Sequence, residues 1–249
     1  MMEEVSNCSF RIRVRESKEW PSEAILSGWG EAILETVGEF LEEIELCNRP
    51  TGILELEYYP ESPIAFYSDQ GNYRKIGLHT KPYFYSQLVY QLAHEMVHYV
   101  SRHNPGANTW FEETLAELSS FYFLKKAAVH WASLNNKRHL QEFAPNHISY
   151  LNDNCLSKIM VISGDEIHKW FENHRNELSC NCYRRDLNSE AAVYLLPYFE
   201  AHAGIWNILG TSPKDRQPDF ASYLNQWEEN SRVQNLDSHI RYFRSSFGV

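Results

Sequence analysis

The hydrophobic pattern of this 249-residue chain changes character once, near Pro82. Before that point, short segments alternate apolar and polar residues or are rich in β-branched and aromatic residues, as β-strands are. After it, apolar residues recur at the three- and four-residue spacing of helices. The predicted strands are 8–15, 53–59, 64–67 and 73–80. The pattern therefore predicts an α+β fold, with a small N-terminal mixed sheet followed by a mostly helical C-terminal lobe.

One long helix is predicted within the sheet region. Apolar residues from Ile25 to Ile44 share a helical face, after Trp20-Pro21-Ser22 and before Asn48-Arg49-Pro50. Breaks between the later helices are expected at Asn135-Asn136 and over 145–154. We expect a single domain, 1–249, made of a sheet lobe with one long helix (1–80), a helix pair (81–135) and a helical lobe (136–249).

Composition restricts the partners and the compartment. The formal net charge is −10 and no block is rich in Lys or Arg, so the positive field that binds nucleic acid is missing. Residues 1–15 lack the apolar run of a secretory signal, and no segment approaches the roughly 20 apolar residues that cross a bilayer. Five scattered cysteines fit a reducing compartment. We therefore expect no nucleic acid or membrane partner and a cytoplasmic location, although delivery by a dedicated secretion system would leave the same pattern.

The segment His94-Glu95-Met96-Val97-His98 is the strongest chemical signal in the sequence. It lies in a helical pattern, so the two histidines stand one turn apart on one face, where two imidazoles can bind one metal ion. Glu95 is rotated by about 100° from His94, so it can reach a water beside the ion without being a ligand. The alternative is a surface helix whose His and Glu side chains form solvated pairs.

The next helix supplies further carboxylates. Thr109-Trp110-Phe111-Glu112 has the form of a capping box, which predicts a helix start at residue 110 and gives Glu112 a structural role. Glu113 and Glu117 are four residues apart and share one face. A catalytic zinc needs a third protein ligand, and a zinc-bound imidazole usually donates its other N–H to an outer carboxylate. One of these glutamates could therefore bind the metal while the other orients a histidine.

Together the two segments resemble the gluzincin zinc metallopeptidases, the thermolysin-like and aminopeptidase-like enzymes with a His-Glu-x-x-His motif. Residues 110–117, Trp-Phe-Glu-Glu-Thr-Leu-Ala-Glu, are similar to the Trp-x-x-Glu-Gly-x-Ala helix of that family, with Thr114 where Gly is common. The resemblance covers roughly residues 88–124. It implies a single metallopeptidase domain with a zincin-like core and one Zn²⁺ per chain. The implied zinc ligands are His94, His98 and Glu113, with Glu117 as the outer carboxylate.

The resemblance also implies a reaction, in which zinc-activated water cleaves a peptide or protein substrate with Glu95 as general base. A Tyr or His usually stabilises the oxyanion in this family; Tyr183 and Tyr194 are candidates, and Tyr194 is taken as the catalytic residue. In this fold class the substrate lies antiparallel to an edge strand, for which 73–80 is the best candidate. The competing hypothesis is a catalytically silent zincin-fold binding or regulatory module.

A second metal site is not expected at Cys180-Asn181-Cys182, with His168 and His174 upstream. Structural zinc sites usually separate paired cysteines by two residues, and a second pair is missing. We expect a loop that joins two helices.

Overall fold

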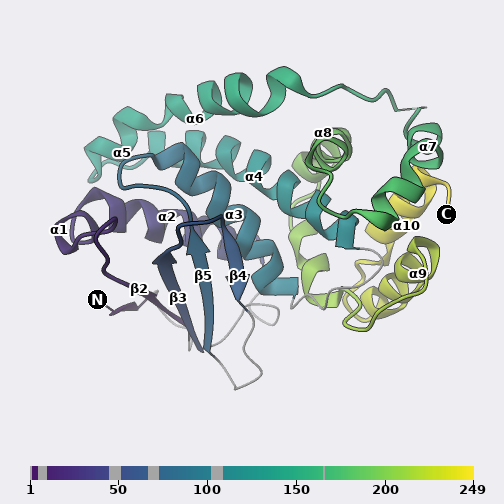
Figure 1. Ribbon diagram of the computed structural model, residues 1–249, viewed down its shortest axis with the longest axis horizontal. Coiled ribbons are helices and arrows are strands. Elements are labelled where there is room, and N and C mark those ends of the chain that lie inside the picture. Colours follow the sequence, from purple (N-terminus) through teal and green to yellow (C-terminus); the bar gives the residue numbers. More distant parts are fainter. Residues whose placement is uncertain (1, 5–9, 45–51, 67–72, 102–108, 165) are drawn as a thin grey trace.

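The computed structural model describes residues 2–4, 10–44, 52–66, 73–101, 109–164 and 166–249 (Figure 1). The strands are β1 (Met2–Glu4), β2 (Phe10–Val14), β3 (Gly52–Tyr58), β4 (Ile64–Phe66) and β5 (Tyr73–Leu78). The helices up to the middle of the chain are α1 (Ser22–Ile25), α2 (Gly28–Glu42), α3 (Tyr85–Ser101) and α4 (Thr109–Ala132). They are followed by α5 (Arg138–Phe143), α6 (Pro145–Tyr150), the π-helix η2 (Leu151–Cys155) and the 3₁₀ helix η3 (Leu156–Lys158). The last elements are α7 (Ile167–Cys180), α8 (Arg185–Ala201), η4 (Ile205–Thr211), α9 (Phe220–Ser231), η5 (Arg232–Gln234) and α10 (Asp237–Phe247). This mixture of a small sheet and many helices agrees with the predicted α+β class.

The described strands form one mixed sheet in the order β1-β2-β3-β5-β4. Strands β2, β3 and β5 run parallel, whereas β1 and β4 are antiparallel and occupy the two edges. Each predicted strand segment overlaps one of β2 to β5, with predicted residues 8, 9 and 67 outside the described part of the chain, and β1 was not predicted. The expectation that 73–80 would be an edge strand is wrong, because β5 lies inside the sheet and β4 forms the edge. Strand order arises from pairing between distant segments, which alternation along one segment does not encode.

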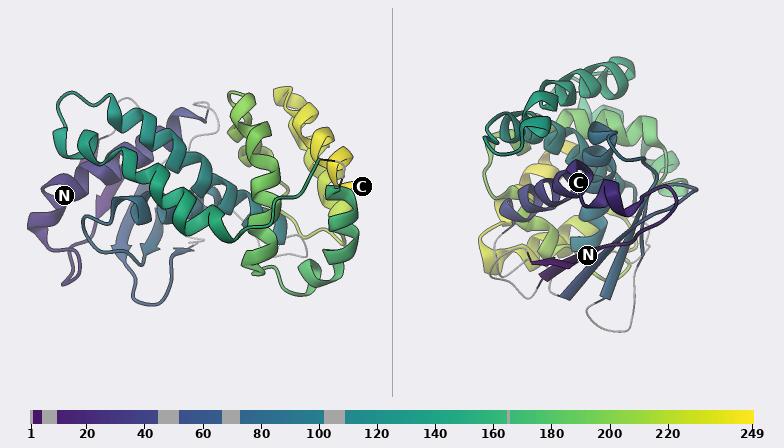
Figure 2. Two further views of the ribbon diagram at one scale, coloured as in Figure 1. Left: turned by 90° about the horizontal axis from the view of Figure 1, so that it is seen from above. Right: turned by 90° about the vertical axis from the view of Figure 1, so that its left-hand side faces the viewer.

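The two faces of the sheet differ in polarity, because successive side chains point to opposite sides. Ile12, Leu54, Leu56, Ile76 and Leu78 are buried on one face, where α3 packs against β5 and β4 (Figures 1 and 2). The other face carries ion pairs. There Arg15 Nε lies 2.5 Å from Glu55 Oε1, and Lys75 Nζ lies 2.7 Å from Glu57 Oε1. The apolar face therefore determines where α3 docks.

The long helix predicted after Pro21 is divided in two. Helix α1 ends at Ile25 and α2 begins at Gly28. At the join, the Ile25 carbonyl oxygen lies 2.1 Å from the position that a Cβ on Gly30 would take, an approach that only glycine allows. Leu26, predicted on the apolar face, is exposed. The apolar spacing on either side does not reveal this turn.

The break predicted over 145–154 is also wrong. Helix α6 begins at Pro145, in the first turn, where the missing N–H of proline needs no partner. The chain continues helically through η2. The break at Asn135-Asn136 is confirmed, since α4 ends at Ala132 and α5 begins at Arg138. None of the helices in the described part of the chain has the length and apolar composition needed to cross a membrane.

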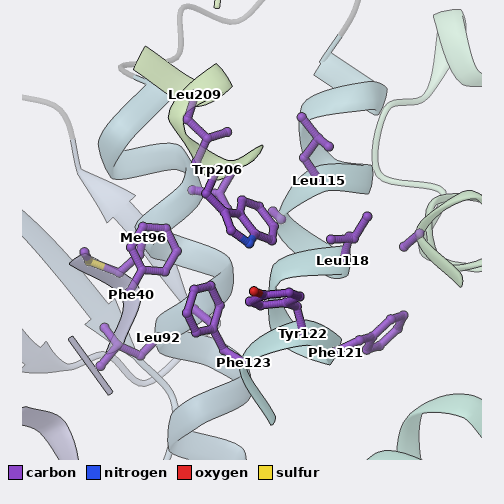
Figure 3. Packing of buried hydrophobic residues seen from close by; sticks show 14 of the residues in the cluster. Phe40, Leu92, Met96, Leu115, Leu118, Phe121, Tyr122, Phe123, Trp206 and Leu209 are labelled. Atoms are coloured by element: carbon purple, nitrogen blue, oxygen red, sulfur yellow. The ribbon is translucent and has the colours of Figure 1, made fainter. Parts of the chain in front are cut away.

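One hydrophobic cluster extends from the sheet to the C-terminal helices. Near its centre, Trp206 of η4 lies between α3 and α4 (Figure 3). Its ring centroid is 5.5 Å from that of Tyr122 and 5.8 Å from that of Phe123, both on α4. Burying an aromatic side chain of this size contributes roughly 2–3 kcal/mol relative to leaving it exposed. Trp206 thereby holds η4 against the helix pair that carries His94 and Glu113.

The first turn of α4 is anchored among the C-terminal helices. The ring of Trp110 lies 4.8 Å from Phe220 of α9, 5.7 Å from Phe171 of α7 and 5.9 Å from Phe247 of α10, measured between centroids. Helices α7 to α10 gather at one end of the elongated molecule (Figure 2). The start of α4 is therefore fixed by this group, and α3 is fixed by the sheet.

Glu39 of α2 is a buried carboxyl within this core. Glu39 is only 5% exposed, and neither of its carboxyl oxygens has a hydrogen-bond partner among the described residues. Burial and the charge of Glu35 raise the pKa of Glu39 to about 8, although Lys126 acts in the opposite direction. The folded chain therefore keeps a proton that the unfolded chain loses above its ordinary pKa of 4.5. This group makes the folded state less stable as the pH rises from about 4.5 to about 8.

Glu39→Gln should remove this pH dependence, because a neutral amide replaces a carboxyl that the fold keeps protonated. The free energy of unfolding of the metal-free chain near pH 8 should rise by on the order of a few kcal/mol, with a much smaller change near pH 4. Urea denaturation at both pH values measures this difference. The same substitution at the exposed Glu142 is the control. An equal increase in the free energy of unfolding at both pH values would contradict the assignment of this pH dependence to Glu39.

Candidate metal centre

Helices α3 and α4 pack side by side in antiparallel register (Figure 1). Ser120 Oγ donates to the Tyr90 carbonyl at 2.8 Å, and Ser119 Oγ donates to the Ala93 carbonyl at 3.0 Å. At the opposite end, Ser101 Oγ donates to Glu112 Oε1 at 2.6 Å. Small side chains at these points let the two backbones approach closely. The register places the last turns of α3 opposite the first turns of α4.

This register brings the three predicted ligands together. His94 Nε2 lies 3.5 Å from Glu113 Oε2, and His98 Nε2 lies 3.5 Å from Glu113 Oε1. One ligand atom from each of these residues lies within 4.8 Å of the other two. No other group of three such residues is close enough to hold a metal ion in the part of the chain that the structure describes.

The three residues fit a zinc ion in both geometry and chemistry. Two imidazole nitrogens and a carboxylate oxygen are zinc ligands, and at bond lengths of about 2.0–2.1 Å a tetrahedral ion separates its ligand atoms by about 3.3 Å. The two nitrogen–oxygen separations of 3.5 Å, which involve different oxygens of Glu113, are close to that value, and the ligand atoms of the group all lie within 4.8 Å of one another. Both imidazoles turn Nε2 toward the carboxylate of Glu113. Their Nδ1 atoms therefore face away from the candidate metal position, toward other groups of the protein.

The other nitrogen of each histidine faces a second carboxylate. His98 Nδ1 lies 3.3 Å from Glu112 Oε1, and His94 Nδ1 lies 3.8 Å from Glu117 Oε2. Glu117 also accepts hydrogen bonds from Tyr90 at 2.6 Å and Ser189 at 3.0 Å. The hydrogen bond to Glu112 favours the tautomer of His98 with Nδ1 protonated and Nε2 available to a metal. The His94 Nδ1 atom is buried and makes no hydrogen bond to a described residue, with Glu117 as its neighbouring carboxylate. Glu113 thus faces Nε2 of both histidines, whereas Glu117 faces Nδ1 of His94.

Glu112 has a role that the sequence interpretation missed. The capping-box pattern assigned it to the start of α4, and the side chain of Thr109 lies outside the described residues. In the structure, Glu112 is buried and contacts both His98 and Ser101. This contact follows from the antiparallel packing of α3 and α4. Glu112 precedes Glu113 on α4, so it lies nearer to the C-terminal end of α3, where His98 is. Glu112 therefore orients the second histidine.

Glu95 lies beside the histidines and is almost fully buried, with 4% exposure. Burial raises the pKa of Glu95, although the charges of His94 and His98 lower it. The Glu95 carboxylate also accepts a hydrogen bond from the backbone N–H of Ala65 on β4. A glutamate with a raised pKa is a better proton acceptor near neutral pH.

Glu112 and Glu113 control the charge of His98. Burial would lower the pKa of His98, but the hydrogen bond to Glu112 and the charge of Glu113 raise it to about 9. Burial would raise the pKa of Glu113, but the hydrogen bond from His94 and the charge of His98 lower it. Without a metal, the centre therefore pairs an ionised Glu113 with a protonated His98, and a metal ion must displace the proton of His98.

The two tyrosine candidates lie in different surroundings. The hydroxyl of Tyr194 lies 3.4 Å from Ser246 Oγ on α10, and it also hydrogen bonds Tyr242. It therefore faces α10, which does not support the oxyanion role predicted for it. Tyr183 lies between α7 and α8 and is 72% exposed. Burial and the nearby groups Cys182 and Glu113 raise the pKa of Tyr183, so its hydroxyl lies within electrostatic reach of the centre.

The segment Cys180-Asn181-Cys182 joins α7 to α8, as predicted. The two upstream histidines contact other groups. His168 Nδ1 lies 3.0 Å from the Phe247 carbonyl, and His174 Nδ1 lies 3.8 Å from Glu177 Oε2.

Comparison of the chain with protein-family models, with curated protein sequences and with solved structures gives no match. The interpretation of this centre therefore depends on its own geometry.

Zinc affinity should rise with pH, because zinc and a proton compete for His98. The apparent dissociation constant should fall about tenfold per pH unit between pH 6.5 and 8, below the pKa of about 9. Glu112→Gln should weaken this dependence by lowering that pKa. Calorimetry at several pH values, repeated in buffers that differ in protonation enthalpy, measures affinity and proton release together. A flat profile for the wild-type chain would contradict the predicted competition.

Glu113→Ala should weaken zinc binding more than Glu117→Ala. The first substitution removes a ligand atom, whereas the second removes a group that only orients His94, for which losses of 10–100-fold are typical. Competition titrations with a chromophoric chelator on both purified variants give the two affinities. The reverse order would exchange the two roles.

Proposed function

We propose that the chain is a zinc-dependent metallopeptidase of the gluzincin kind, built on a zincin-like core. The observation that carries this proposal is the approach of His94, His98 and Glu113 within 4.8 Å, next to the buried Glu95. Three protein ligands leave the fourth position of a tetrahedral zinc open to water, which is characteristic of catalytic sites and not of structural ones.

Bound at this centre, zinc would lower the pKa of a water toward 7 and polarise a substrate carbonyl. Glu95 moves the protons of the reaction. It takes a proton from the attacking water and donates it to the leaving amine, and its raised pKa suits both steps. Glu112 holds the imidazole of His98 by a hydrogen bond, and Glu117 is the carboxylate that would hold that of His94.

The proposed substrate is an extended segment of a peptide or protein, bound antiparallel to β4. This edge strand packs against α3, and Ala65 within it contacts Glu95. A sheet edge attracts an extended chain because its outer backbone groups have no strand partner. For stabilisation of the oxyanion we propose Tyr183 in place of Tyr194, because the charge of Glu113 acts on Tyr183 and its side chain is exposed.

Glu95→Gln should abolish peptide cleavage while zinc stays bound. Glutamine keeps the size of the side chain and an oxygen that accepts from Ala65, but it cannot carry the proton. We expect the rate of cleavage to fall by about 10²–10⁴-fold. Mass spectrometry of a peptide library incubated with zinc-loaded protein measures cleavage, and elemental analysis measures bound zinc.

Glu142→Gln is the matched control, since it makes the same chemical change at an exposed glutamate of α5. Cleavage retained in Glu95→Gln would refute the assigned base. Zinc binding without cleavage by the wild-type chain would favour the catalytically silent module instead.

A further inference from the structure

Two histidines from distant parts of the sequence meet among the C-terminal helices. His202 directly follows α8, and His239 lies in the first turn of α10, next to α8 (Figure 2). Their ring centroids are 5.5 Å apart, and the ring planes are inclined by 81°. Neither histidine belongs to the candidate metal centre. This pair is a second place where two imidazoles of the chain come close together.

A single residue, Tyr198 of α8, contacts one nitrogen of each ring. The Tyr198 backbone carbonyl accepts a hydrogen bond from His202 Nδ1 at 2.7 Å, and the Tyr198 hydroxyl lies 3.0 Å from His239 Nδ1. A carbonyl only accepts, so Nδ1 of His202 carries the proton and Nε2 keeps its lone pair. The hydroxyl can accept from Nδ1 of His239 in the same way. Neither Nε2 atom makes a hydrogen bond to a described residue.

The spacing of the two rings fits one metal ion. With metal–nitrogen bonds of about 2.0–2.1 Å and a tetrahedral angle, two imidazoles on one ion have ring centroids about 5.2 Å apart. The centroid separation of His202 and His239 is 5.5 Å, and that of His94 and His98 in the candidate centre is 5.2 Å. The interplanar angles of 81° and 64° are also comparable. The two pairs of histidines therefore have similar arrangements.

The second pair is held by packed aromatic rings. Tyr198 stacks on Tyr242 of α10, with centroids 3.6 Å apart and planes within 3°, and the His202 ring lies 4.1 Å from the Tyr198 ring. Burial and the charge of His202 lower the pKa of His239 below its ordinary value of 6.5, so its imidazole is neutral near pH 7. The neutral imidazole is the form that binds a metal ion.

We propose that His202 and His239 form a second metal site, which takes a divalent transition-metal ion such as Zn²⁺, Ni²⁺ or Cu²⁺. Imidazole nitrogen suits these ions, whereas Mg²⁺ and Ca²⁺ take oxygen ligands. Tyr198 has the part that outer carboxylates have in the candidate centre, because it fixes the Nδ1 atoms and leaves Nε2 to the ion. The site is independent of the proposed peptidase function.

An ion at this site links the end of α8 to the start of α10. No described carboxylate or cysteine completes a group of three with the two histidines, so water fills the other positions. The second site therefore binds zinc more weakly than the candidate centre. Because the ion binds only the folded chain, it should raise the midpoint of thermal unfolding.

Equilibrium dialysis of the whole chain against buffered Zn²⁺, followed by elemental analysis, tests this proposal. The wild-type chain should bind one equivalent tightly and a second weakly, and gel filtration in metal-free buffer should remove only the second. His202→Gln and His239→Gln should each weaken the second equivalent by at least about tenfold, because one of two linked ligands is lost. The first equivalent should not change in either variant.

Two further variants sharpen the test. His174→Gln removes an imidazole of α7 that lies 3.8 Å from Glu177, and this control should keep both equivalents. Tyr198→Phe keeps the aromatic ring but loses the hydroxyl beside His239, and it should weaken the second equivalent by about 10–100-fold, as is typical for outer groups. Weakly bound zinc should raise the midpoint of thermal unfolding in His174→Gln as in the wild type, and not in His239→Gln.

Copper gives a measurement that needs no change at the second site. Bound to the His94→Ala/His98→Ala chain, Cu²⁺ should show hyperfine coupling to two imidazole nitrogens in its paramagnetic resonance spectrum. Coupling to fewer than two would overturn the proposal. A wild-type chain without a second equivalent, or a second equivalent that survives both His202→Gln and His239→Gln, would overturn it as well.

The same titrations separate the two metal sites. A wild-type chain that lacks the tight equivalent but loses its weak one in His202→Gln would refute the candidate centre and leave the second site standing. A chain that keeps the tight equivalent alone would do the opposite.

Discussion

The antiparallel packing of α3 on α4 is the constraint on which the centre depends. Its register is fixed by short hydrogen bonds from serines of α4 to carbonyls of α3, including Ser120 to Tyr90 and Ser119 to Ala93. With that register, two histidines four residues apart meet one glutamate of the facing helix, and a further glutamate stands behind each histidine. A shift by one residue on either helix would rotate these side chains away from one another.

The rest of the fold holds this helix pair from two sides. The sheet supports α3 through its apolar face and brings Ala65 of β4 to Glu95. The C-terminal helices hold the first turn of α4 through Trp110, and Trp206 packs against Tyr122 and Phe123 of α4. The predicted ligands therefore lie on two helices that the sheet supports on one side and the C-terminal helices support on the other. A site of this kind needs such support, because ligand positions must be held to within a fraction of an ångström.

Part of the fold and of the centre follows from local sequence patterns. Helical spacing places His94 and His98 on one face and Glu113 and Glu117 on another, and the structure brings the histidines and Glu113 together. Patterns along one segment do not specify contacts between segments. The position of β5 inside the sheet and the contact of Glu112 with His98 depend on pairing between separate segments of the chain. The turn between α1 and α2 is local, but the apolar spacing continues on both sides of it and hides it. Helical spacing does not show which way α8 turns Tyr194, whose hydroxyl faces Ser246 of α10.

The central claim is that zinc binds between His94, His98 and Glu113, and X-ray absorption spectroscopy of the zinc-loaded chain tests it most directly. The account predicts a shell of nitrogen and oxygen atoms at about 2.0–2.1 Å that includes two imidazoles. Replacing both histidines by alanine should abolish this signal and the bound zinc. Sulfur at about 2.3 Å, which would indicate cysteine ligands, or a spectrum unchanged by the two substitutions, would contradict the account.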